Sequence, residues 1–373
     1  MRILARAQAL EGQGRDIVHM EVGEPDFPTP EPVVRAAQAA LAAGHTRYTP
    51  AAGLTALREA IAGYYAQRFG VAVSPARVLV TPGSSLALQL ALAALVDPGD
   101  EVLLCDPGYP CNRHLVRLAG GSAVPIPVGP DTGFRPTPAH VGAVWTPRAR
   151  ALLVASPANP TGTVIGRAAM AGLRDAVVAH GGMLVVDELY QGLDYGAEPH
   201  TALALGDDVM VVNGFSKYFG MTGWRVGWLV APERFTPVLD RLAQNLYLAA
   251  PTVAQHAALA ALSPETFAIL DTRRDILRER RDRLLAGLEG LGFRVVAPPE
   301  GAFYLYADSS AVASDSFAFS ERLLEEAGVA VTPGADFGTH RSEQYVRFAY
   351  TTDVSRLEEG TSRVSGLLRR ARS

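Results

Sequence analysis

The sequence predicts an α/β protein with a mostly parallel sheet flanked by helices, followed by a smaller α+β unit. Short apolar runs alternate with helical patterns from residue 77 to residue 232, which is the rhythm of βα units. These runs are rich in β-branched residues and nearly continuous, as in strands that are buried on both faces. Long helical patterns and a few separate strand patterns follow residue 232.

The segment before the alternating region predicts an irregular arm and two helices. The arm ends in EVGEPDFPTP (21–30), whose prolines are incompatible with a regular helix. An alanine-rich helix is expected over 31–44, where Gly44 closes it. YTPAAG (48–53) predicts a loop, and 54–70 predicts an amphipathic helix.

Strand and helix patterns then alternate along the central region. A parallel sheet of this kind places its binding sites beyond the carboxyl ends of its strands. The expected strands cover 77–81, 101–106, 122–128, 151–157, 183–188, 208–216 and 224–232. The expected helices cover 81–96, 108–120 and 168–181.

Two long helical patterns, 232–250 and 264–292, lead into the carboxyl-terminal unit. The charged run RRDILRERRDR in the second predicts a solvated helix face. In the final unit we expect strands at 293–298, 301–307, 329–334 and 344–350 and helices at 316–328 and 354–371. The expected parts are an amino-terminal arm with part of the small domain (1–40), a large domain (41–260) and a small carboxyl-terminal domain (261–373).

Composition narrows the class of partner. The chain has 373 residues, 48% hydrophobic and 19% charged, with a formal net charge of −4. Long runs of lysine or arginine are absent, so neither a nucleic acid nor an anionic membrane is expected as a partner, and a small molecule is. MRILARAQAL does not fit a signal peptide and no uncharged apolar stretch of about 18 residues occurs, which predicts a cytoplasmic protein. Cys105 and Cys111 predict neither a disulfide nor a metal site.

Polar loops follow four of the expected strands. They read TPGSS, SPANPTG, DELYQG and NGFSKYFGMTGWR. Because the carboxyl ends of parallel strands lie at one edge of a sheet, these loops are expected to converge on one site.

Gly83, Ser84 and Ser85 stand between an apolar strand and an apolar helix. A glycine turn followed by the first N–H groups of a helix favours an anion such as phosphate. The alternative is an ordinary helix cap by one of the serines. The sequence lacks GxGxxG after the first strand and lacks GxxxxGK[ST], so a phosphate ester smaller than a dinucleotide or nucleoside triphosphate fits better.

Asp187 and Lys217 each follow an apolar run. A carboxylate emerging from a buried strand needs a cationic or protonated partner, or else belongs to a structural ion pair. A lysine in a desolvated, glycine-lined pocket beside another cation has a lowered pKa and can act as a nucleophile; the alternative is a solvent-exposed loop lysine. Arg225 could be that cation, or could grip a phosphate.

Taken in order, the stretches resemble the class I and II aminotransferases of fold type I, which use pyridoxal 5′-phosphate (PLP). The resemblance covers essentially the whole chain. The matching stretches are VGEPDFPTP, YTPAAGLTALREAI, TPGSSLAL, DPGYP, SPANPTG, VVDELY, SKYFGMTGWRVGW and VRFAY.

The resemblance implies a role for each matching cofactor residue. Lys217 would form the Schiff base with PLP and shuttle the proton, and Asp187 would keep the pyridine nitrogen protonated. Tyr109 would stack on the cofactor ring, and Asn159 and Tyr190 would bond its hydroxyl. The remaining matches, which resemble phosphate ligands, are Gly83, Ser84, Ser85, Ser216 and Arg225.

The resemblance also implies substrate contacts and a homodimer. Arg347 would bind the substrate α-carboxylate in a bidentate pair, unless it is a strand arginine paired with a surface acid. Gly23 and Asn159 would lie beside the substrate. Tyr48 would reach the cofactor phosphate of a neighbouring subunit, or is a packed loop tyrosine.

The activity implied is ping-pong transfer of an amino group from an L-amino acid to a 2-oxo acid, with 2-oxoglutarate expected as acceptor. Carbon–sulfur lyases, adenosylmethionine-eliminating synthases and decarboxylases of the same fold share these cofactor residues. The preference for transamination rests mainly on SPANPTG and SKYFGMTGWRVGW, which resemble the aminotransferase branch. A more distant alternative is the effector-sensing module of transcription regulators, for which a basic helix-turn-helix pattern is missing. The donor stays open: Arg113, His114 and Arg117 could bind a side-chain carboxylate or could be solvated helix residues.

Overall fold

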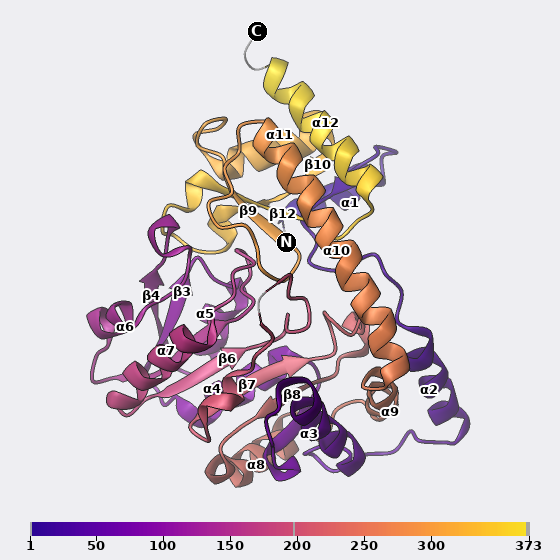
Figure 1. Cartoon of the computed structure of the whole chain (residues 1–373), viewed down its shortest axis with the longest axis vertical. Helices are drawn as coiled ribbons and strands as arrows, with labels where there is room; N and C mark the ends of the chain where they lie inside the picture. Colours follow the sequence, from indigo (N-terminus) through magenta and orange to yellow (C-terminus); the bar gives the residue numbers. More distant parts are fainter. Residues whose placement is uncertain (1, 197, 371–373) are drawn as a thin grey trace.

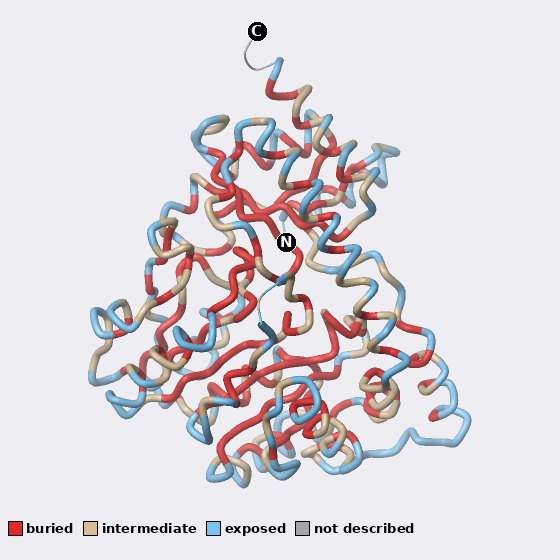
Figure 2. The backbone as a smooth tube through the Cα atoms, in the orientation of Figure 1, coloured by how far each residue is buried: buried red, intermediate tan, exposed pale blue. Residues whose placement is uncertain are grey.

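The computed structural model describes residues 2–196 and 198–370. Figure 1 shows a lower part built on a large sheet and an upper part built on small sheets, with one long helix, α10 (Pro264–Gly290), running alongside both. The buried backbone is concentrated in the strands of the two parts, and the outer helices carry the exposed residues (Figure 2). The predicted α/β class with a smaller α+β unit is confirmed.

The large sheet has seven strands in the order β2-β8-β7-β6-β5-β3-β4. Neighbouring strands are parallel except at β8, which runs antiparallel to both β2 and β7. The strands are β2 (Val78–Thr81), β3 (Glu101–Asp106), β4 (Ser122–Pro127), β5 (Ala149–Ala155), β6 (Met183–Asp187), β7 (Val209–Gly214) and β8 (Gly227–Val230).

Helices cover both faces of this sheet, which explains why its strands are apolar on both sides. Side chains of α4 and α8 pack on one face with residues such as Leu79 and Val185. Side chains of α3, α6 and α7 pack on the other face with Val80 and Val186. The helices of this part are α2 (Glu31–Ala42), α3 (Thr55–Phe69), α4 (Ser84–Leu95), α5 (Pro110–Leu118), α6 (Pro138–Val144), α7 (Arg167–Ala179), α8 (Thr236–Leu246) and α9 (Thr252–Ala261).

The smaller part combines the two ends of the chain. A three-stranded antiparallel sheet has the order β11-β12-β9, and β1 pairs with β10 in a parallel ribbon. The elements are α1 (Arg2–Glu11), β1 (Val18–His19), β9 (Tyr304–Asp308), α11 (Ser316–Ala327), β10 (Val329–Ala330), β11 (Thr332–Pro333), β12 (Tyr345–Ala349) and α12 (Val354–Arg370).

The structure differs from the sequence-based elements in several places. Among the helices, α6 and α9 were not predicted. Residues 2–11 form α1, which was not predicted to be a helix; its apolar side packs on α11 and β10, so tertiary contact stabilises a short helix. Residues 293–298 form no strand, and only Arg294 makes an isolated bridge to Asp308.

The division into an arm, a large domain and a small domain stays a prediction. Its boundary at residue 40 falls inside α2, which packs on α9 of the large part. α1 and β1, by contrast, contact α11 and β10.

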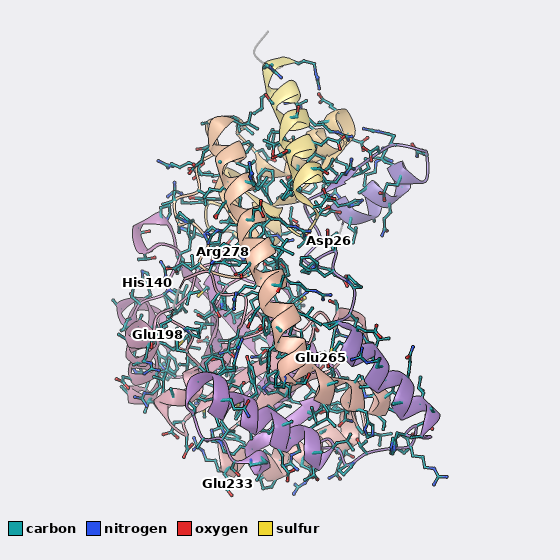
Figure 3. The ribbon with its side chains drawn as sticks, turned by 45° about the vertical axis from the view of Figure 1, so that its right-hand side comes forward. Asp26, His140, Glu198, Glu233, Glu265 and Arg278 are labelled. Carbon is teal, nitrogen blue, oxygen red and sulfur yellow. The ribbon has the colours of Figure 1, made fainter. Side chains whose placement is uncertain are left out.

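An ion pair between a buried arginine and an exposed aspartate ties the arm to α10. Arg280, 5% exposed, donates to both carboxylate oxygens of Asp26 over 2.8 and 3.0 Å and to the carbonyl oxygen of Thr351 over 3.0 Å. Figure 3 shows Asp26 on the arm beside the middle of α10, and Glu265 near the amino end of that helix. Glu265 forms an ion pair of 3.0 Å with Arg35 of α2, so α10 is fixed to the arm and to α2.

Within the described ranges, no helix has the length and apolar character needed to cross a bilayer. The same residues contain no group of three or more histidine, cysteine or acidic side chains arranged to hold a metal ion.

Candidate active site

Most of the predicted site residues line one pocket of about 450 Å³ at the carboxyl ends of β5, β6 and β7. The upper rim of this pocket comes from the arm, α1, β9 and β12 of the smaller part. The predicted residues that line it are Gly23, Ser84, Ser85, Tyr109, Asn159, Asp187, Tyr190, Ser216, Lys217, Arg225 and Arg347.

Lys217 lies in the loop after β7 and is largely buried. Its Nζ donates a hydrogen bond of 2.7 Å to the carbonyl oxygen of Gly23. Burial lowers the pKa of Lys217 to about 8; Arg347 and Arg225 push it further down, whereas Glu24 and Asp187 oppose the shift. About a tenth of the amine is therefore unprotonated at pH 7, far more than for an ordinary lysine, and the unprotonated form is the one that acts as a nucleophile or proton acceptor. Lys217 is also the only lysine among the 373 residues, a signal that sequence reasoning missed.

Asp187 ends β6 at the floor of the pocket. Its Oδ1 accepts a hydrogen bond of 3.0 Å from the backbone N–H of Leu189. Burial raises the pKa of Asp187 to about 6, while the Leu189 N–H and Lys217 lower it. A protonated ring nitrogen placed against this carboxylate would provide the cation that the buried charge needs.

The turn before α4 and the Arg225 loop form a cradle for an anion. Gly83 has a φ of +85°, and a Cβ at this residue would clash with the guanidinium of Arg225. Gly227 is equally restricted, because a Cβ there would clash with the backbone N of Ser84. The two glycines therefore let Arg225 and the first N–H groups of α4 converge, which suits a phosphate. Arg225 itself has a φ of +53° and donates to the carbonyl oxygen of Thr222 over 2.9 Å.

Arg347, on β12, is 6% exposed. It donates to Oδ1 of Asn159 over 2.9 Å and to the carbonyl oxygen of Glu21 over 2.6 Å. Its guanidinium stacks on the Tyr304 ring with 4.1 Å between Cζ and the centroid, and its buried Nε has no partner. A planar, fixed guanidinium facing a pocket is suited to a carboxylate. The alternative of a surface ion pair does not describe this side chain.

Aromatic residues complete the walls. The hydroxyls of Tyr190 and Tyr304 lie 2.9 Å apart, and burial raises the pKa of Tyr190 well above its usual value. Tyr109 caps the start of α5 and faces the same pocket. Burial raises the pKa of Tyr109 as well, so the phenols of Tyr109 and Tyr190 stay protonated and can donate hydrogen bonds.

The donor set of the pocket fits PLP. It combines an amine for the aldehyde, an acid for the ring nitrogen, a hydroxyl and an amide for the ring oxygen, and a glycine-lined cradle for the phosphate. No part of this fit requires a metal ion.

Some predicted residues lie elsewhere. Tyr48 is 84% exposed and does not line this pocket. Arg113, His114 and Arg117 are exposed on α5, and Arg113 donates to the carbonyl oxygen of Asp336 over 3.3 Å. None of the three lines the pocket, although Arg113 contacts the backbone of Asp336, which does.

Sequence reasoning missed most residues at the end of the pocket near Arg347. Ile3 and Leu4 belong to a helix that was not predicted, so no signal pointed to them. Tyr304 lies in a predicted strand, but nothing marked it as facing a site. The others are Glu21, Val22, Thr332, Asp336 and Phe337.

Comparison with known proteins gives a consistent result. A family model described as aminotransferase class I and II matches residues 15–364. Over 367 residues the chain is 41% identical to a valine–pyruvate aminotransferase of Mycobacterium tuberculosis, covering 98% of this chain and 94% of the relative. It is 40% identical to an aspartate/prephenate aminotransferase of Thermus thermophilus, covering 98% and 95%. The crystal structure of an aminotransferase from Mycobacterium tuberculosis superposes with a TM-score of 0.96 at 40% identity, covering 99% and 96% of the two chains.

Proposed function

The chain belongs to the class I and II aminotransferases, and we propose that the pocket around Lys217 is where this PLP-dependent enzyme transfers an amino group from an amino acid to a 2-oxo acid. The observation that carries the site assignment is the convergence of Lys217, Asp187, Arg225 and Arg347, from four distant segments, on one pocket. Each of the four has a charge that suits one atom group of the cofactor or substrate, and Asp187 and Arg347 are buried.

The residues around the phosphate would fix the position of the cofactor. Arg225 provides a fixed cation, and the hydroxyls of Ser84, Ser85 and Ser216 provide hydrogen bonds. Gly83 keeps the backbone close enough for the helix N–H groups to contribute. Tyr109 would pack on one ring face, and Tyr190 and Asn159 would bond the ring oxygen.

When bound, PLP supplies an electron sink for the carbanion that forms at the substrate α-carbon. Asp187 maintains that capacity by holding a proton on the ring nitrogen. Lys217 anchors the cofactor and then takes and returns the proton at the α-carbon, for which a pKa of about 8 is well matched. Arg347 and Asn159 orient the α-carboxylate so that the proton faces Lys217.

We also propose that two chains form a homodimer with shared sites. Tyr48 stands almost fully exposed beside Arg47, as a residue that completes a neighbouring site would in an isolated chain. Sedimentation of the purified enzyme tests the dimer, and loss of PLP affinity in Tyr48→Ala tests the contact. The cytoplasmic location and the acceptor 2-oxoglutarate stay predictions.

Reductive trapping tests the site assignment. Borohydride reduction of the holoenzyme fixes PLP on the amine that holds it, and mass spectrometry of the peptides locates the label. Because Lys217 is the only lysine, the single competing amine is the amino terminus. Label on the peptide containing Lys217 supports the proposal, whereas label on the amino terminus alone overturns it.

A further inference from the structure

We infer that the amino acids and 2-oxo acids handled by this enzyme carry uncharged, apolar side chains rather than a second carboxylate. The inference rests on the proposed function, because it takes the cofactor and α-carboxylate to lie where that function places them. It is drawn from the charges and surfaces left over in the pocket.

The proposed function already gives a role to each cationic side chain that lines the pocket. Among its described lining residues, the cationic side chains are Lys217, Arg225 and Arg347. The proposed function assigns one to the cofactor carbonyl carbon, one to the phosphate and one to the substrate α-carboxylate. A substrate side-chain carboxylate would therefore enter the pocket without a further cation among these lining residues to pair with, which is costly.

Two further acids line the same pocket. Glu21 is 7% exposed, and its Oε2 is buried without a hydrogen-bond partner. Its other carboxylate oxygen, Oε1, lies 2.7 Å from Nδ1 of His19. Asp336 precedes Phe337 at the rim. Both are acids, so neither supplies a cation for a second carboxylate of the substrate.

The surface beside Arg347 is apolar. The Phe337 ring centroid lies 4.9 Å from Cζ of Arg347. Ile3 of α1 packs in a cluster with Ala330, two residues before Thr332, whose Oγ1 accepts from Arg347 over 3.2 Å. Figure 1 shows α1 in the upper part of the molecule beside β10. α1 therefore brings Ile3 and Leu4 to the end of the pocket where the substrate side chain would lie.

In the proposed dimer, a cation for such a carboxylate could come from a second copy of the chain, which carries Arg47 beside Tyr48. Its only lysine is Lys217, which is needed in its own site, so a partner would have to contribute an arginine or a histidine. Such a contribution is one outcome of the experiment below. An aliphatic or aromatic side chain needs no such residue and buries its surface against Leu4 and Phe337.

The test is a set of single-turnover measurements on the holoenzyme. Leucine, valine, methionine and phenylalanine are compared with aspartate and glutamate, and the change in cofactor absorbance reports amino transfer. We expect the apolar donors to be favoured in rate constant over dissociation constant by at least about 100-fold. Calorimetric binding of two unreactive acids gives a readout besides activity, with 4-methylpentanoate expected to bind more tightly than succinate.

The outcomes separate the two ideas. If aspartate or glutamate reacts as fast as leucine, or succinate binds as tightly as 4-methylpentanoate, the inference is wrong while the proposed function stands. If no amino acid changes the spectrum, the proposed function fails as well.

A charge-insertion variant sharpens the assignment of the wall. Leu4→Arg places a cation at the pocket and is expected to raise the aspartate-to-leucine ratio at least about tenfold. Ala5→Arg is the matched control, since this exposed neighbour on α1 does not line the pocket. Equal ratios in the two variants would show that α1 does not border the substrate side chain.

Discussion

The two ends of the pocket are held in different ways. At the cofactor end, Asp187 and Lys217 follow strands β6 and β7, whose residues are buried on both faces by packed helices. At the substrate end, side chains come partly from β9 and β12, two buried strands that pair over five residues. The others come from α1 and the arm, which are held by a small apolar cluster, by the two-residue pairing of β1 with β10 and by ion pairs. The first end is positioned by one closely packed sheet, whereas α1 and the arm at the second end are held by a smaller set of contacts. Changes at the first should alter the chemistry, and changes at the second should alter stability and substrate choice.

The largest effect is expected at Lys217. Lys217→Arg keeps the charge but removes an amine that can exchange a proton near neutral pH, so single-turnover transamination should fall by at least about 10⁴-fold. PLP should still bind through the phosphate and ring contacts, as equilibrium dialysis would show. Turnover within tenfold of the wild type would break the assignment.

Asp187→Asn should give the next largest loss. Without the carboxylate the ring nitrogen loses its proton, and transfer of the α-proton should slow by about 10²–10³-fold. Glu188→Gln is a matched control, since Glu188 is a buried acid whose carboxylate accepts from Thr201 and Ala202 rather than facing the pocket. A substrate α-deuterium isotope effect should appear or grow in Asp187→Asn and stay at the wild-type value in the control. If proton transfer slows equally in both variants, the loss comes from removing a buried acid and not from the contact between Asp187 and the ring nitrogen.

At the substrate end, Asp26→Asn should mainly affect stability. The change leaves the buried guanidinium of Arg280 without its counter-ion, at a cost of about 2 kcal/mol in the free energy of unfolding. Asp275→Asn removes an exposed partner of Arg278 and should cost less than about 0.5 kcal/mol. Urea denaturation of the three proteins measures the difference, and a cost in Asp26→Asn no larger than that of the control would remove the distinction drawn here.

The smallest expected effect depends on pH. His19 lies between Glu21 and Glu11, and its hydrogen bond to Glu21 raises its pKa from 6.5 to about 9 despite partial burial. A raised pKa stabilises the fold fully below pH 6.5, and the contribution is lost as the pH rises through about 9. Below pH 6.5 the wild type should exceed His19→Gln by about 1 kcal/mol in free energy of unfolding. Above about pH 9 the two proteins should be equally stable. A difference that is independent of pH would contradict the charged pair.

The same contrast explains what could be predicted from the sequence. The strands of the large sheet and the loops after them were predicted because apolar runs and turn residues are local signals. Gly83, Asp187 and Lys217 follow such runs, and Arg225 comes just before one. The antiparallel direction of β8 was not foreseen, since a short strand reads the same in either direction.

The substrate end could not be predicted in this way. α1 is stabilised by contacts with α11 and β10, which are more than 300 residues away in the sequence. Ile3, Leu4 and Phe337 are ordinary apolar residues whose position at a pocket depends on that long-range packing. Tyr48 was predicted from the resemblance alone, and in the isolated chain its ring faces solvent.

The small core of α1 has an evolutionary consequence. Ile3, Ala7 and Leu10 pack with Ile17, Leu324 and Ala330 in a cluster separate from the two that hold the large sheet. Mutations on this helix can therefore accumulate without perturbing the residues that perform the chemistry. A related enzyme could therefore acquire a different substrate preference through substitutions in α1, while the residues of the cofactor end stay unchanged.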